Sequence, residues 1–215
     1  MTSSPPRKIG VVLFEGFELL DVFGPLEIFG ARPEAFSITL IGPDAGAVAS
    51  NQGPAAVCNY AYAEAPECDI VLVPGGMGTR RLVADETFLR WLAAWADRAE
   101  FVTSVCTGAA LLAAAGLLDD RRATSNKQAF RWVVTTSDRV KWVPQARWVV
   151  DGRCWTSSGV AAGIDMALGL VAHLSGEEDA RGVATHVEYE WHSDSSWDPF
   201  ASVYGLEDIE SSPSA

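Results

Sequence analysis

Short apolar segments bounded by turn residues recur along the first half of the chain: Ile9–Phe14, Phe36–Ile41, Ile70–Val73 and Phe101–Val105. They are apolar at successive positions rather than at alternate ones, which is typical of strands covered on both faces. Segments with helical periodicity lie between them: Pro25–Phe29, Glu86–Ala99 and Ala109–Leu118. This alternation of strands and helices predicts an α/β fold with a mostly parallel sheet.

The second half of the chain adds a hairpin and two helices. Trp148–Val150 and Cys154–Thr156 flank the turn residues Asp151 and Gly152, which predicts two antiparallel strands. Helical patterns then cover Val160–Leu174 and Glu177–Tyr189. No internal repeat or Pro/Ser/Gly linker divides the chain, so we expect a single domain over residues 1–215, with its core at 8–190. The tail, 190–215, is first aromatic and then polar, and its tryptophans predict packing over apolar surface.

Composition excludes several classes of protein. Apolar residues make up 48% of the chain and charged residues 20%, which excludes intrinsic disorder. The net charge of −12 would repel a phosphate backbone, so we expect no nucleic-acid partner. The longest apolar run is too short to span a membrane, and no membrane partner is expected. Four cysteines without a Cys-x-x-Cys pair indicate no disulfide framework, and we expect a cytoplasmic protein.

A single cysteine stands where the fourth apolar segment ends and a helix begins at once. Ser104 lies two positions before Cys106, and Gly108 lies two positions after it. Small residues at these positions are typical of a strained turn from strand to helix, where larger side chains would collide with backbone. The N–H groups at the helix start, beginning with that of Thr107, are expected to lower the thiol pKa and to bind an oxyanion. Cys106 is the predicted nucleophile, and a buried core cysteine is the alternative.

Glycines follow the third apolar segment, in the run Pro-Gly-Gly-Met-Gly that begins at Pro74. Glycines after a strand let backbone N–H groups approach a ligand closely. We expect Gly76 to supply a second oxyanion donor and Gly75 to contact the substrate. A tight turn without a ligand remains an alternative. A dinucleotide site is disfavoured because the G-x-G-x-x-G spacing is absent.

One acidic residue lies within an apolar segment near the start of the chain. Asp21 follows Leu19 and Leu20 and precedes Val22 and Phe23. An acid in such surroundings is either a helix cap or a buried functional carboxylate. A helix start at Pro25 supports the cap, although Gly24 is the nearer capping position, so both interpretations stay open.

The histidines give no signal for a metal. The chain contains three of them, His173, His186 and His192, and none forms an H-E-x-x-H motif. We expect no bound metal.

Four segments in order resemble the ThiJ/PfpI superfamily, a flavodoxin-like branch related to glutamine amidotransferases. They read VVLFEGFELLDVFGPLEIF, DIVLVPGG, FVTSVCTGAALLAAAGLLDDRRATS and GVAAGIDMALGLVAHL, and together they cover about residues 8–190. Within the superfamily they are most similar to the isocyanide hydratase group and to the ligand domains of related transcription regulators. Those regulators carry an additional helix-turn-helix domain, and these 215 residues show none, so we expect no DNA binding.

The resemblance implies a flavodoxin-like three-layer sandwich with a nucleophile elbow, and a homodimer. It implies that Cys106 is the nucleophile, that Asp21 is an acid hydrogen-bonded to the thiol, and that Thr107 follows the nucleophile as in the hydratase group. Gly76 and Thr107 would supply backbone donors. The implied reaction is attack of the Cys106 thiolate on an isocyanide carbon, with Asp21 assisting proton transfer, followed by release of an N-substituted formamide by water. No cofactor is implied.

Two departures from the family pattern bear on the substrate. Protease-like members place a histidine directly after the cysteine, where this chain has Thr107. Glyoxalase-like members and many hydratases have a histidine where this chain has Asn126, which we expect to donate a hydrogen bond to a substrate heteroatom. Three alternatives stay open: glyoxalase-type conversion of methylglyoxal, a redox-sensing or stress-protective role in which Cys106 is oxidised, and a ligand-binding module.

Overall fold

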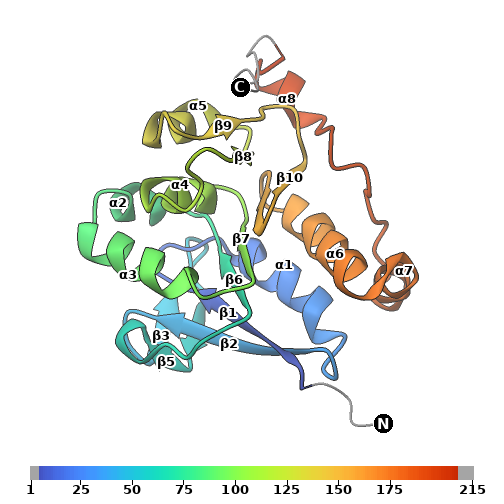
Figure 1. Ribbon diagram of the computed structural model, residues 1–215, viewed down its shortest axis with the longest axis horizontal. Helices are drawn as coiled ribbons and strands as arrows, with labels where there is room; N and C mark the ends of the chain where they lie inside the picture. Colours follow the sequence, from blue (N-terminus) through green and yellow to red (C-terminus); the bar gives the residue numbers. More distant parts are fainter. Residues whose placement is uncertain (1–4, 208–215) are drawn as a thin grey trace.

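The computed structural model describes residues 5–207 and is built on a seven-stranded sheet (Figure 1). In spatial order the strands are β10 (Trp148–Asp151), β11 (Cys154–Ser157), β7 (Phe101–Ser104), β6 (Ile70–Val73), β1 (Arg7–Val12), β2 (Phe36–Gly42) and β5 (Tyr60–Ala61). Neighbouring strands are parallel except β10, which pairs antiparallel with β11. The predicted α/β fold and the predicted hairpin are therefore both confirmed.

The strand order reverses direction at the centre of the sheet. The chain runs from β1 outward to β2 and then returns to β6, on the other side of β1. Connections diverge at such a point and leave a crevice beyond the carboxyl ends of the central strands, where α/β proteins bind ligands. The topology therefore predicts a ligand site among the residues that follow β1, β6 and β7.

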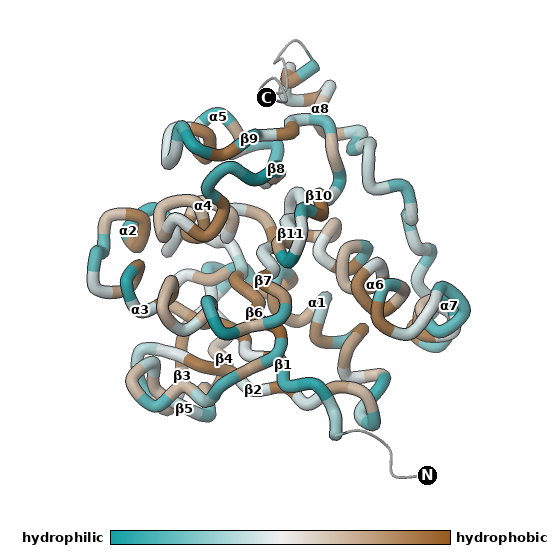
Figure 2. Tube along the Cα trace, viewed as in Figure 1, coloured by the Kyte–Doolittle hydropathy of each residue, from teal (hydrophilic) through white to brown (hydrophobic). Residues whose placement is uncertain are grey.

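Helices cover both faces of the sheet and complete the three-layer sandwich. In Figure 1, α1 (Leu19–Gly30) and α6 (Ala162–Ser175) lie on one side of the sheet, and α3 (Glu86–Ala96) and α4 (Gly108–Ala114) lie on the other. The helix α7 (Glu177–His186) packs on α6 from outside. Figure 2 shows apolar residues along β6 and α6 and polar ones along α7, in agreement with these depths.

Several short elements were not predicted from the sequence. A small second sheet pairs β3 (Gly46–Ala49) with β4 (Ala55–Cys58), and a third pairs β8 (Arg122–Ala123) with β9 (Lys141–Trp142). Short helical turns complete the structure: α2 (Thr79–Leu82), α5 (Phe130–Val133), α8 (Phe200–Val203), η1 (Tyr62–Glu64) and η2 (Val134–Thr136). Segments of two to four residues are too short to show a hydrophobic period.

The start of the first helix was predicted wrongly. The helix begins at Leu19 rather than at Pro25, so Pro25 lies inside it and Gly24 is not a cap. Proline removes one intrahelical hydrogen bond. Burial of Val22, Ile28 and Phe29 against the core outweighs that loss. The longer helix places Asp21 in its first turn, beneath the crevice.

A buried ion pair fastens the tail to the domain. Asp165, in the first turn of α6, is fully buried and accepts hydrogen bonds from Arg147 Nε at 2.7 Å and from Arg147 Nη2 at 2.5 Å. The same carboxylate accepts from the Tyr189 hydroxyl at 3.1 Å and from the His192 N–H at 3.0 Å. The last two contacts fix the path of the tail across α6.

The expected packing of the aromatic tail is only partly correct. Trp191 packs against the core and donates to the Asp165 carbonyl, whereas Trp197 is 62% exposed. The polar end of the predicted tail, 208–215, lies outside the described residues.

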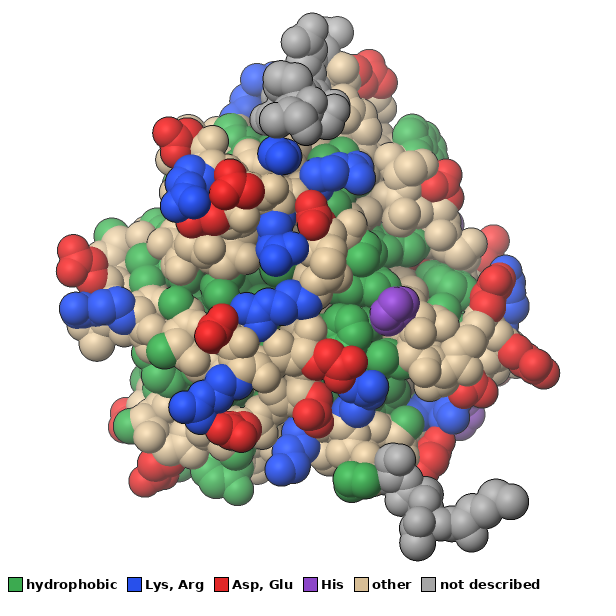
Figure 3. Space-filling view, in the orientation of Figure 1, with side chains coloured by type: hydrophobic (Ala, Val, Ile, Leu, Met, Phe, Trp, Pro, Cys, Tyr) green, Lys and Arg blue, Asp and Glu red, His purple; other side chains and the backbone are tan. Residues whose placement is uncertain are grey.

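Charged side chains of both signs lie on the surface. On the face drawn in Figure 3, basic and acidic side chains are interspersed rather than gathered into a basic patch. Among residues 5–207, no helix is both long enough and apolar enough to cross a bilayer.

Replacing Asp165 by Asn should destabilise the protein by about 3 kcal/mol, because the buried Arg147 guanidinium would lose its nearest counter-charge and keep only the Asp198 carboxylate, 4.0 Å away. The matched control is Glu67→Gln, which removes one charge from the exposed Arg98–Glu67 pair and should cost no more than about 0.5 kcal/mol. Urea unfolding of the two variants measures both values. Equal losses would contradict the structural role of the buried pair.

Candidate active site

Segments that follow five strands meet at one cleft of about 390 Å³. Each contributes a lining residue: Glu18 after β1, Gly76 after β6, Cys106 after β7, Asn126 after β8 and Val160 after β11. The cleft therefore lies beyond the carboxyl ends of the strands, at the place that the topology indicates.

The residues predicted from sequence fall into two groups around this cleft. Cys106, Thr107, Gly76 and Asn126 line it. Asp21 and Gly75 are buried and are not among the residues that line it.

Cys106 occupies a strained backbone conformation. Its φ is +57°, which L-residues other than glycine seldom adopt. Its N–H donates to the Ser158 carbonyl at 3.0 Å, and its own carbonyl accepts from the Ser125 hydroxyl at 2.7 Å. These two bonds come from segments that follow β11 and β8, so the elbow is held from outside its own strand and helix.

The structure explains why small residues flank Cys106. A Cβ on Gly108 would collide with the carbonyl oxygens of Val73 and Pro74, at the end of β6. Ser104 is fully buried in the last position of β7. The elbow predicted from the spacing of small residues is present, and close approach of β6 to the start of α4 is its cause.

The Asp21 carboxyl lies beside the Cys106 thiol in a site withdrawn from water. Its Oδ2 accepts a hydrogen bond from the Gly75 N–H at 2.7 Å. Its Oδ1 has no hydrogen-bond partner of ordinary geometry among the described residues. The nearby thiol interacts with the carboxyl group. Asp21 is therefore a buried carboxyl group and not a helix cap, since the capping position is Glu18. Its functional role stays a prediction.

Burial governs the protonation of this pair. It raises the pKa of Asp21 from 3.8 to about 8, with a smaller contribution from the charge of Glu18 in the same direction. Burial, together with the Asp21 charge, also raises the pKa of the Cys106 thiol above its ordinary value. At neutral pH the resting pair holds its protons. The expectation of a lowered thiol pKa was wrong because loss of water outweighs the N–H groups at the short helix α4.

Three donors nevertheless face the sulfur. The backbone N–H groups of Thr107 and Val160 and the side chain of Asn126 all lower the thiol pKa. The Asn126 Oδ1 accepts a hydrogen bond from the Ala129 N–H at 2.9 Å. The Asn126 Nδ2 is therefore the atom that can donate to the Cys106 sulfur. Asn126 is thus a fixed amide donor in the place of a titratable imidazole.

The two glycines after β6 have different contacts from those predicted. Gly75 holds Asp21 rather than facing the cleft, and a Cβ there would lie 2.5 Å from the Thr107 nitrogen. The Gly76 N–H donates to the Thr107 hydroxyl at 3.1 Å, so its donor is engaged. The Thr107 hydroxyl also accepts from Thr79 at 3.2 Å. An oxyanion role for Gly76 stays a prediction.

Sequence reasoning missed several residues of the cleft. Val160 contributes its N–H from a strained turn with φ +37°, directly after Gly159. Arg80 and Gln128 line the cleft from α2 and from the segment before α5. The Ser-Ser-Gly run before Val160 is a turn signal after a predicted strand, and it could have indicated this loop.

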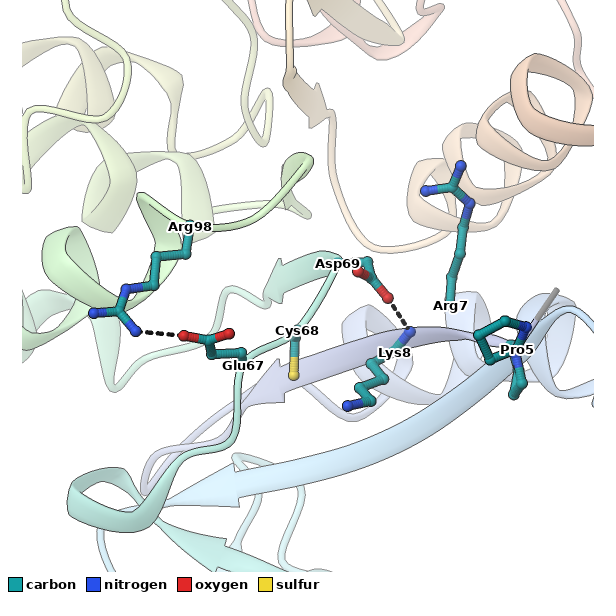
Figure 4. Close-up of a pocket in the computed structure, with 8 residues that line it drawn as sticks. Pro5, Arg7, Lys8, Glu67, Cys68, Asp69 and Arg98 are labelled. Atoms are coloured by element: carbon teal, nitrogen blue, oxygen red, sulfur yellow. Dashed lines mark hydrogen bonds and ion pairs between the residues drawn. The ribbon is translucent and has the colours of Figure 1, made fainter.

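The other three cysteines lie away from the cleft. Cys68 lines a pocket at the amino ends of β1 and β6, whereas the cleft lies beyond their carboxyl ends (Figure 4). Burial raises the pKa of its thiol to about 11. Cys58 and Cys154 are also buried and free. None of the three histidines lines the cleft, and residues 5–207 contain no His/Cys/Asp/Glu cluster that could hold a metal.

Comparison with known proteins identifies the family. Residues 7–173 match the model of the DJ-1/PfpI family. The chain is 35% identical over 182 residues to the isonitrile hydratase of Pseudomonas putida. The aligned region covers 85% of this chain and 78% of that protein. It is 27% identical over 190 residues to the transcriptional regulator GbdR of Pseudomonas aeruginosa. That alignment covers 86% of this chain and 51% of the regulator.

A solved structure gives the same result. The crystal structure of a ThiJ/PfpI family protein from Pseudomonas syringae superimposes with a TM-score of 0.79 at 29% identity, over 87% of this chain and 77% of that one. Sequence and fold therefore agree that this chain belongs to the DJ-1/PfpI family.

Proposed function

We propose that this protein hydrates an isocyanide to an N-substituted formamide, with Cys106 as nucleophile and Asp21 as the proton donor. The observation that carries the proposal is the buried pair of thiol and carboxyl, whose Asp21 pKa of about 8 keeps a proton available at neutral pH. The similarity to an isonitrile hydratase supports the choice of substrate.

The first step adds the thiol to the terminal carbon of R–N≡C. Asp21 delivers a proton to that carbon while the Cys106 sulfur bonds to it, and the thiol proton returns to the carboxyl. The product is the thioimidate R–N=CH–S–Cys106, and no proton or electron is gained or lost. The donors around the sulfur favour this step because they stabilise negative charge on it as the proton leaves.

The second step hydrolyses the thioimidate. Water attacks the same carbon, Asp21 relays a proton from the water to nitrogen, and the C–S bond breaks as the thiol is restored. The formamide R–NH–CHO leaves, so the sum is one isocyanide and one water. Asn126 would donate to the developing nitrogen or oxygen, and its permanent amide protons make this contact independent of pH.

A glyoxalase reaction is the weaker candidate. It requires a base that moves a proton between adjacent carbons, and the Asn126 amide, fixed by Ala129, cannot serve as one. Oxidation of Cys106 in a sensor uses the same pair of residues and is separated from catalysis by the turnover experiment below.

We also propose that the protein is a homodimer in the cytoplasm. Leu20 and Phe23, both on α1, are 41% and 45% exposed in the single chain. A second copy of the chain would cover this apolar surface.

Cys106→Ala should reduce hydration of a simple alkyl isocyanide at least about 10³-fold, because no other group in the cleft can form the thioimidate. Formation of the formamide, followed in the ultraviolet, measures the rate. The control is Cys154→Ser, a cysteine distant from the cleft, which should retain wild-type turnover. Activity that survives in Cys106→Ala would rule out the proposal. No turnover in wild type with any isocyanide would favour the oxidation sensor.

The raised pKa of Asp21 predicts a pH dependence of stability. The native state keeps a proton on Asp21 that the unfolded chain releases above about pH 4. The stability that this proton contributes is complete below that pH and is lost as the pH rises through about 8. Relative to Asp21→Asn, the wild-type free energy of unfolding should therefore fall across this window, by up to about 1.4 kcal/mol per pH unit.

Denaturant unfolding of both proteins at several pH values checks the sign. A difference that stays constant from pH 4 to pH 8 would show that Asp21 is already ionised. Ionisation of Asp21 should also lower kcat/KM of the wild type above about pH 8, because the proposed proton donor is then lost.

A further inference from the structure

One positively charged side chain, that of Arg80, lines the cleft and has no role in the proposed mechanism. Arg80, on α2, lines the cleft together with Cys106. Its guanidinium carbon lies 3.4 Å from the ring centroid of Trp132, on α5. Two elements about fifty residues apart in the sequence are thus brought together beside the nucleophile.

The charge of Arg80 is not neutralised within the described part of the chain. The guanidinium makes no hydrogen bond or ion pair with any residue of 5–207, and its side-chain contact is with the Trp132 ring. Glu18 lines the same cleft, but its carboxylate accepts a hydrogen bond from Gln52 and forms no ion pair with Arg80. The other polar side chains that line the cleft carry no charge: they are the amides of Asn51, Asn126 and Gln128 and the hydroxyl of Thr107.

The contact with the Trp132 ring leaves the N–H groups of the Arg80 guanidinium without a hydrogen-bond partner among residues 5–207. An arginine that rests one face on an aromatic ring is held in place, and the N–H groups at its edge still point outward in a plane. Those N–H groups match a carboxylate, which accepts two parallel hydrogen bonds. The charge of a Cys106 thiolate acts on the Arg80 pKa, so the cation is within electrostatic reach of the reacting sulfur.

We infer that Arg80 binds a carboxylate on the substrate, so that the electrophile attacked by Cys106 is a small molecule with an anionic group. If the proposed function holds, the substrate class is an isocyanide that carries a carboxylate. The inference rests on that function only for the identity of the reacting group, because recognition of the carboxylate is a separate property of the cleft.

The overall charge of the chain makes this inference easy to test. At a net charge of −12, the protein as a whole repels anions, so any preference for an anionic reagent must come from a local cation. Two alkylating reagents of similar size, iodoacetate and iodoacetamide, differ in that only the first carries a carboxylate. Both react with the same thiolate, so the ratio of their rates at Cys106 cancels the thiolate fraction and reports recognition of the charge.

The experiment measures this rate ratio by mass spectrometry of the Cys106 peptide in wild type and in variants. Arg80→Met should lower the ratio of iodoacetate to iodoacetamide about tenfold, because a charge-assisted pair near the sulfur is lost. Arg80→Lys, which keeps the charge, should restore part of it. The matched control is Arg81→Met, which removes the same charge from the next position of α2, outside the cleft, and should leave the ratio unchanged.

A second comparison applies the inference to turnover. Isocyanoacetate and its methyl ester share the reacting carbon and differ in charge, so the ratio of their kcat/KM values should favour isocyanoacetate in wild type and fall about tenfold in Arg80→Met. An alkylation ratio that is the same in wild type and Arg80→Met would overturn the inference, whatever the isocyanides show. A ratio that depends on Arg80, without turnover of either isocyanide, would support the carboxylate site and count against the proposed hydration.

Discussion

The burial of one carboxyl group beside one thiol governs the protonation of the candidate site. Asp21 is fully buried, and its carboxyl accepts a hydrogen bond from the Gly75 N–H and lies beside the Cys106 thiol. Taking a carboxylate out of water without a cation is costly, so the group keeps its proton. That proton is what distinguishes this site from a cysteine–histidine pair, in which an imidazole removes the thiol proton. In the proposed function, this pair delivers a proton and a nucleophile to the same atom.

The remainder of the site holds this pair in place. The sheet brings the ends of β1, β6 and β7 together, and only glycine at 108 allows the start of α4 to approach β6 so closely. The positive φ of Cys106 persists because Ser125 and Ser158 bond its carbonyl and its N–H from two other segments. The polar network around Thr107 fixes the loop after β6. Rigid elements on several sides thus set the geometry of one side chain.

The central strands and the elbow could be predicted because their signals are local. Ile70–Val73 was predicted with its observed bounds, and the small residues around Cys106 indicated a tight turn that the structure contains. The start of α1 was missed because packing of its apolar face overrides Pro25. The pKa of Cys106 was misjudged because burial depends on residues distant in sequence. Arg80 and Val160 were missed for the same reason, since only the fold brings them to the cleft.

The most direct test of the account is to look for the covalent thioimidate. Wild-type protein that is turning over an alkyl isocyanide can be quenched rapidly in acid and digested, and the mass of each cysteine-containing peptide measured. The account predicts an adduct on the Cys106 peptide equal to the mass of the whole isocyanide, transient during turnover and gone when substrate is exhausted. Formamide production without any adduct on Cys106, or with the adduct on another cysteine, would contradict it.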